Sequence, residues 1–160
     1  MTEFAPQPPW SAVLEELLSE ARDLGFLGPG PVAAQIDRSL AFARMVTAVP
    51  QFAIDLGSGG GLPGLVLALE WSSTRWTFIE SNQRKAAWLE RAVARSGTTK
   101  RVEVSCERAE NLARSNLRAS SDLVTARSFA APAPTAECAA PFLKLGAPLL
   151  VAEPPDRPPS

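Results

Sequence analysis

The segment from Phe52 to Gly64 constrains the fold of this chain more than any other part of the sequence. It begins with an apolar run that contains one acid, Phe52 to Leu56, and enters a turn with four glycines. A second apolar segment, Leu65 to Leu69, leaves the turn. A short apolar run bounded by glycines is typical of a buried strand. We therefore expect a strand, a tight turn and the N-terminus of a helix.

This turn suits a ligand that comes close to the backbone. Glycine has no Cβ to block the approach and tolerates positive φ, so backbone N–H groups can face a ligand. Asp55 comes just before the glycines, where its carboxylate would repel a phosphate. S-adenosylmethionine carries a sulfonium, an ammonium and a ribose, and it fits an acidic glycine turn. We predict that Asp55, Gly57 and Gly59 bind this cofactor.

Two other interpretations of the same turn stay open. Gly59 to Gly64 satisfies the pattern G-x-G-x-x-G, and Glu80 follows about 20 residues later, as in a dinucleotide site. Asp55 before the turn and Pro63 inside it count against a pyrophosphate there. The turn could also hold no ligand, although so many glycines lose much backbone entropy on folding.

Helix-like and strand-like segments predict the fold class. Apolar residues repeat at helical spacing over residues 11–24, with Ser11 as the N-cap, and over 31–50. We expect strands at 51–55, 76–80, 101–105, 122–126 and 148–152, and helices at 62–69, 81–96, 107–112 and 133–145. Alternation of this kind predicts an α/β fold, a parallel sheet with helices on both faces. We divide the chain into N-terminal helices (1–50), a sheet core (51–153) and a disordered Pro-rich tail (154–160).

Polar side chains stand at the carboxyl ends of these strands. They are Asp55, Glu80, the stretch 106–110 and Arg127. Ligands of such sheets bind beyond these ends, near the point where the strand order reverses. We therefore expect these residues along one cleft. There the two carboxylate oxygens of Glu80 would accept hydrogen bonds from the hydroxyls of a ribose, unless Glu80 is a plain surface residue.

Composition narrows the class further. The length of 160 residues suggests one domain, and no apolar run is long enough to cross a bilayer. The acidic, Pro-rich N-terminus does not resemble a signal peptide. Two cysteines and no histidine fit a reduced cytoplasmic protein without a metal site. We expect a monomer with no membrane association.

Charge is divided unevenly along the chain. Residues 1–83 carry nine acidic and four basic side chains, whereas residues 84–127 carry ten basic and five acidic ones. The basic part could meet a polyanion such as RNA, or it could form solvated helix faces.

Several motifs, taken in order, resemble one family. They are Ile36 to Leu40, the glycine motif from Asp55 to Gly64, Lys85 with Leu89, Arg108 to Glu110, and Thr125 to Ala130. This combination resembles the small-subunit ribosomal RNA guanine-N7 methyltransferases, also called glucose-inhibited division protein B. The resemblance covers about residues 35–153.

The resemblance implies a Rossmann-like class I methyltransferase that uses S-adenosylmethionine and acts on ribosomal RNA or the small ribosomal subunit. Gly57 and Leu62 would contact the cofactor, and Ala109 and Glu110 would flank its adenine. Arg127 would line the active site beside the methionine end, as the candidate catalytic residue. Guanine N7 already holds a lone pair in the ring plane, so the reaction needs orientation and no general base.

The chain also departs from the family. Gln35 stands where the family usually has a histidine, and Glu153 where a basic residue is common. Gly28 to Pro31 occupies the place of a longer N-terminal helical stretch. We expect the chain to be shortened at both ends, without the last two strands of the fold.

Three functions of other kinds stay open beside the RNA methyltransferase. One is a cofactor-binding module without RNA activity, and another is a methyltransferase of small molecules. The third is a nucleotide-dependent oxidoreductase, which would bind NAD rather than S-adenosylhomocysteine.

Overall fold

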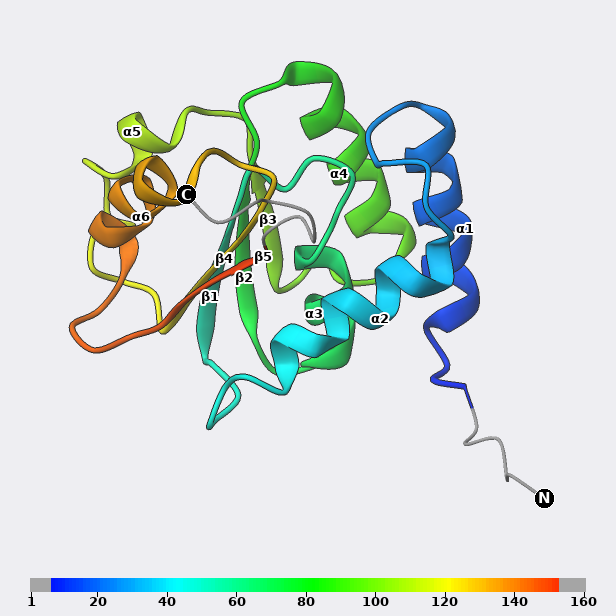
Figure 1. Ribbon diagram of the computed structural model, residues 1–160, viewed down its shortest axis with the longest axis horizontal. Coiled ribbons are helices and arrows are strands. Elements are labelled where there is room, and N and C mark those ends of the chain that lie inside the picture. The colour runs from blue at the N-terminus through cyan, green and yellow to red at the C-terminus, as the bar shows by residue number, and fades with distance from the viewer. Residues whose placement is uncertain (1–6, 153–160) are drawn as a thin grey trace, which may run out of the picture.

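The computed structural model describes residues 7–152. At its centre lies a parallel sheet in the order β3-β2-β1-β4-β5, and the sequential order of the strands reverses between β1 and β4 (Figure 1). The strands are β1 (Phe52–Leu56), β2 (Arg75–Ile79), β3 (Val102–Ser105), β4 (Leu123–Arg127) and β5 (Leu149–Ala152). Every predicted strand is found, with its ends shifted by no more than one residue, and the parallel α/β sheet is confirmed.

Helices cover both faces of the sheet (Figure 1). On one side lie α3 (Gly64–Glu70) and α4 (Gln83–Arg95), with α1 (Ser11–Asp23) and α2 (Val32–Ala43) packed outside them. On the other side lie α5 (Ala109–Leu112), α6 (Pro132–Ala139) and the 3-10 helix η1 (Ala140–Phe142). The central strands β1, β2 and β4 are buried by both layers, as their apolar composition requires, whereas the edge strands β3 and β5 are partly exposed.

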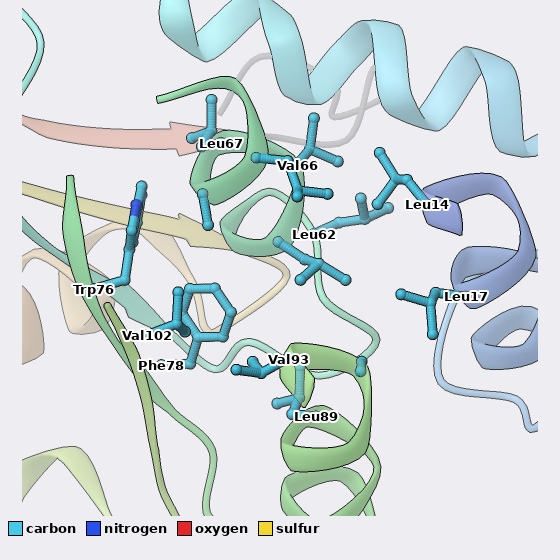
Figure 2. Packing of buried hydrophobic residues seen from close by; sticks show 14 of the residues in the cluster. Leu14, Leu17, Leu62, Val66, Leu67, Trp76, Phe78, Leu89, Val93 and Val102 are labelled. Atoms are coloured by element: carbon cyan, nitrogen blue, oxygen red, sulfur yellow. The ribbon is translucent and has the colours of Figure 1, made fainter. Parts of the chain in front are cut away.

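One hydrophobic cluster joins the N-terminal helices to the sheet core. Leu14 and Leu17 of α1 point toward Leu62, Val66 and Leu89 (Figure 2). Residues 1–50 were assigned above to a segment of their own, but its described part shares one core with α3 and α4. Three tryptophans are also buried in this cluster, Trp71, Trp76 and Trp88.

Several helix boundaries differ from the prediction, and α3, α4 and α5 each begin two residues later than expected. α1 begins at Ser11 itself, after Trp10, so the predicted Ser11 cap is wrong; the Ser11 N–H donates to the Pro8 carbonyl in the preceding turn. α2 ends at Ala43, well before Pro50, because the following N–H groups bond three residues back and form a turn. The helix predicted over 133–145 stops at Ala139 and continues as η1.

Two further observations bear on the predictions. No helix in the described range 7–152 combines the length and apolar character needed to cross a membrane. The expectations for Glu153 and for a disordered tail at 154–160 fall outside the described residues.

Candidate functional site

A cavity of about 350 Å³ opens where the strand order reverses, at the carboxyl ends of β1, β2 and β4. This volume lies in the range of small-molecule sites. The predicted site residues that line it are Gly57, Gly59, Leu62, Glu80, Ala109, Glu110 and Arg127. The structure thus brings together residues from β2, β4, α5 and the glycine turn, while Asp55 is not among the lining residues.

The glycine turn is held by hydrogen bonds within the protein. The N–H groups of Gly57 and Ser58 donate to the Ile79 carbonyl at 2.8 and 3.2 Å. Gly57 has φ +63°, and a Cβ there would lie 2.8 Å from the ring of Phe129, so only glycine fits. Because these N–H groups are already engaged, the turn is a shaped wall more than a cradle for phosphate. That geometry counts against the dinucleotide interpretation.

Glu80 connects the turn to the start of α4. Its side chain is almost buried, with Oε1 accepting from the Gly59 N–H and Oε2 from the Asn82 N–H, both at 2.9 Å. A carboxylate has about four lone-pair positions. Each oxygen therefore keeps room for one more donor, and Glu80 faces the cavity with that capacity.

Asp55 lies behind the turn, which corrects the predicted contact with a ligand. Side chains alternate along β1, so Asp55 faces the same layer as Ala53, where α3 covers it, and it is fully buried. Its Oδ1 accepts from the Thr125 hydroxyl at 2.7 Å. Its Oδ2 faces the Gly64 backbone. Among the described residues, this oxygen has no hydrogen-bond partner of regular geometry. Burial raises the pKa of Asp55 to about 7, against the lowering effect of the Thr125 hydrogen bond.

Arg127 ends β4 at the cavity, half-buried. Among the described residues, its Nη1 is buried without a hydrogen-bond partner. Burial, followed by the positive charge of Arg38, lowers the pKa of Arg127. A buried donor without a partner is costly, so this atom fits a ligand that brings an acceptor or a negative charge.

The lining carries charges of both signs. Besides Arg127 it contains the basic Lys85 and Arg108 and the acidic Glu80, Glu107 and Glu110. Arg108 and Glu110 form an exposed ion pair at 3.5 Å. Such a mixed lining suits a ligand with both positive and negative groups. Within residues 7–152, no group of His, Cys, Asp and Glu could hold a metal ion.

Sequence reasoning missed part of the lining. Phe26, Leu27 and Gly28 reach the cavity from the loop between α1 and α2, and Lys85 and Phe129 also line it. The Gly-Pro-Gly-Pro run at 28–31 interrupts the helical pattern, but no local signal shows that this segment covers the glycine turn.

Comparisons with known proteins relate the chain to one family. Residues 32–152 match the family model described as GidB, rRNA small subunit methyltransferase G. The protein named Ribosomal RNA small subunit methyltransferase G from Prochlorococcus marinus (strain MIT 9313) is 43% identical over 59% of this chain and 39% of its own length. Its namesake from Clavibacter sepedonicus is 34% identical over 85% of this chain and 64% of its own length. The chain thus spans between two fifths and two thirds of these relatives.

Solved structures resemble the chain in fold. An O-methyltransferase from Bacillus cereus in complex with SAH aligns with a TM-score of 0.59 at 16% identity, over 78% of this chain and 56% of that one. A methyltransferase from Geobacter sulfurreducens aligns with a TM-score of 0.63 at 18% identity, over 93% and 72%. At such identities the likeness concerns the fold alone, and it confirms the predicted Rossmann-like class I architecture.

Proposed function

The chain belongs to the rRNA small subunit methyltransferase G family, and we propose that its cavity binds S-adenosylmethionine and positions N7 of a guanine in small-subunit ribosomal RNA for methylation. The observation that carries this proposal is the convergence of Glu80, the glycine turn and the unpartnered Nη1 of Arg127 on one cavity. We further propose that the protein acts as a monomer in the cytoplasm, where its RNA substrate is found.

The residues present fit this cofactor. Glu80 offers carboxylate oxygens to a pair of ribose hydroxyls, while Ala109 and Glu110 form the wall assigned to the adenine. Gly57, Gly59 and Leu62 form the wall of the turn. The Nη1 of Arg127 supplies the donor that an amino-acid carboxylate needs.

The chemistry asks little acid–base work of the protein. S-adenosylmethionine, when bound, supplies an electrophilic methyl group. Guanine N7 needs no deprotonation, so the protein must orient the base and exclude water around it. The absence of histidine and tyrosine from the sequence is compatible with this reaction.

The end of β4 carries the side of the site proposed for the acceptor base. Phe129 lines the cavity directly after Arg127 and Ser128. Ser128 has φ +53°, an uncommon conformation for a residue other than glycine, and it turns the chain so that the Phe129 ring lies over Gly57. An aromatic face beside a guanidinium suits stacking and hydrogen bonding to a purine.

Calorimetric binding of S-adenosylhomocysteine tests the cofactor site. We expect Glu80→Ala to weaken binding at least tenfold, because the ribose acceptors and the Gly59 anchor are removed together. Glu90→Ala, which removes an exposed glutamate from α4, is the matched control and should change affinity less than about twofold. Binding of NAD in place of S-adenosylhomocysteine would overturn the proposal.

Methylation of undermodified small ribosomal subunits tests the substrate. We expect transfer to a guanine N7, abolished by Arg127→Ala in a chain that stays folded. Cofactor binding without transfer to RNA would favour a binding module instead. Turnover on a metabolite that is independent of salt would favour a methyltransferase of small molecules.

A further inference from the structure

The loop between α1 and α2 forms one wall of the cavity. Phe26, Leu27 and Gly28 line it together with Glu80 and the glycine turn. The loop approaches Gly60 so closely that a Cβ there would lie 2.5 Å from the Leu27 side chain and 2.8 Å from the Phe26 carbonyl oxygen. These three residues precede the segment 32–152 that matches the family model. The match to the family model therefore does not cover this wall of the cavity.

Gln35 of α2 holds this loop in place. Its Nε2 donates to the carbonyls of Gly28 and Gly30, at 3.2 and 2.9 Å. The side chain is 2% exposed, and its Oε1 has no hydrogen-bond partner among residues 7–152. A buried acceptor without a partner destabilises the fold. The favourable contribution of the Gln35 amide to the structure thus comes from its two hydrogen bonds to the loop.

The outer side of the loop is fixed less firmly. The Phe26 ring packs edge-on against Trp88, with centroids 6.2 Å apart. Arg84 and Lys85 of α4 place their charges 5.8 and 6.0 Å from the Phe26 ring centroid. Exposed cation–π contacts of this length contribute little. The Phe26 N–H donates to the Ala21 carbonyl at 2.8 Å and fixes the start of the loop. The two hydrogen bonds from Gln35 are the side-chain contacts that fix the part of the loop that follows, at Gly28 and Gly30.

We propose that Gln35 is a positioning residue for the methyl-donor site: its amide holds Phe26–Gly28 against Gly60, and the loop so placed completes the cofactor cavity. This inference rests on the proposed function of the cavity. It makes the N-terminal helices part of the binding site, acting through the loop that joins them.

Gln35→Met separates positioning from general stability. Methionine keeps the length and most of the volume of the side chain, and it removes the unpartnered Oε1 together with the two bonds to the loop. The two effects on unfolding oppose each other. We therefore expect a small shift of the melting temperature without ligand, comparable to that of Ser39→Ala. Ser39 is buried one turn away, and its hydroxyl donates to the Gln35 carbonyl of its own helix.

The experiment combines two measurements on the full chain. Hydrogen exchange of residues 25–31 without ligand reports whether the loop is held, and calorimetry with S-adenosylhomocysteine reports whether it forms a wall. We expect Gln35→Met to speed exchange in this loop and to weaken binding about tenfold, the equivalent of two neutral hydrogen bonds. Ser39→Ala should leave both readouts within about twofold of the parent.

Gly60→Ala gives a second route to the same effect. Its Cβ meets Leu27 and the Phe26 carbonyl, so it should displace the loop and raise exchange at 25–31 while Gln35 stays intact. Unchanged exchange and unchanged affinity in both variants would overturn the inference. If the parent chain fails to bind S-adenosylhomocysteine, the proposed function fails, while the exchange data still decide whether Gln35 holds the loop.

Discussion

The carboxyl of Asp55 lies behind the glycine turn, between the Thr125 hydroxyl of β4 and the backbone of Gly64. A Cβ on Gly64 would lie 2.5 Å from Oδ2, so the start of α3 rests directly on this group. Asp55 thus packs against Gly64 behind the turn, and Glu80 holds the turn by accepting a hydrogen bond from the Gly59 N–H. The two acids next to the glycine turn therefore differ in their surroundings: Asp55 is fully buried, whereas Glu80 faces the cavity.

The buried carboxyl predicts an unusual pH dependence of stability. Its pKa is about 7 in the fold, against 3.8 when exposed. Between these values the folded state holds a proton that the unfolded state has released, so the contribution of Asp55 to stability falls as pH rises. Asp55→Asn keeps an acceptor for Thr125 and removes the charge.

As the pH rises from 5 to 8, the free energy of unfolding of Asp55→Asn, measured with urea, should therefore increase relative to that of the parent. We expect this difference to grow on the order of 1.4 kcal/mol for each pH unit below about pH 7. Parallel pH curves for parent and variant would show that Asp55 is ionised in the fold at all these pH values.

At the scale of elements, Arg101 holds the C-terminal end of the short helix α3. Its guanidinium donates to the carbonyl of Ala68 in the last turn of the helix, and to the carbonyls of Trp71 and Thr74 in the turn that follows it. α3 has only seven residues, too few to be stable alone. Arg101, directly before β3, thus fixes the C-terminal end of the helix that follows the glycine turn.

Arg101→Met tests this role. The substitution keeps the apolar stem and removes the donors, and we expect a loss of about 1–2 kcal/mol in the free energy of unfolding. Arg91→Met is the control, because Arg91 is exposed and makes one 3.4 Å bond to its own helix. Equal effects of the two variants on urea denaturation would contradict the assignment.

At the scale of the whole molecule, the charges of the folded chain differ between the surface that we propose for RNA and the cavity that we propose for the cofactor. The cavity lining is mixed in sign, whereas the basic residues Arg114 and Arg118 follow α5 on the surface outside it. The acidic N-terminal part is partly neutralised by contacts with α4, since Arg95 bonds to Glu16 and Glu20 at 2.8 and 2.6 Å. RNA would meet the basic surface, and the cofactor would meet the mixed cavity.

This separation predicts different responses to salt. The KM for ribosomal subunits should rise steeply with salt, because contacts to phosphates release counterions. The Kd of S-adenosylhomocysteine should change less than about twofold over the same range. Replacing Arg114 and Arg118 by alanine should reduce the slope of log KM against log salt by about one for each phosphate that the variant no longer neutralises. An unchanged slope would place the RNA on another face.

Sequence periodicity was sufficient for the order of strands and helices, the parallel sheet and the edge of the sheet that carries the site. Apolar alternation and glycine spacing are local properties, and the rule that ligands bind at the carboxyl ends of strands needs no coordinates. That Glu80, Arg127 and the residues around Ala109 line one cavity could therefore be predicted from their positions at the strand ends. Helix ends such as Ala43 could not be predicted in this way, because the turn that follows a helix depends on what the chain packs against next.

Which side chains face the cavity was decided only by the tertiary structure. Asp55 is a local neighbour of the glycines, yet the pleat of β1 turns it under α3 and out of the cavity. Phe26 and Leu27 lie far from the turn in sequence and reach it because α1 and α2 pack on α3 and α4. The sequence could not predict this lining for a physical reason. Sequence motifs reflect local requirements of the backbone, whereas a binding site consists of surfaces that long-range packing brings into contact.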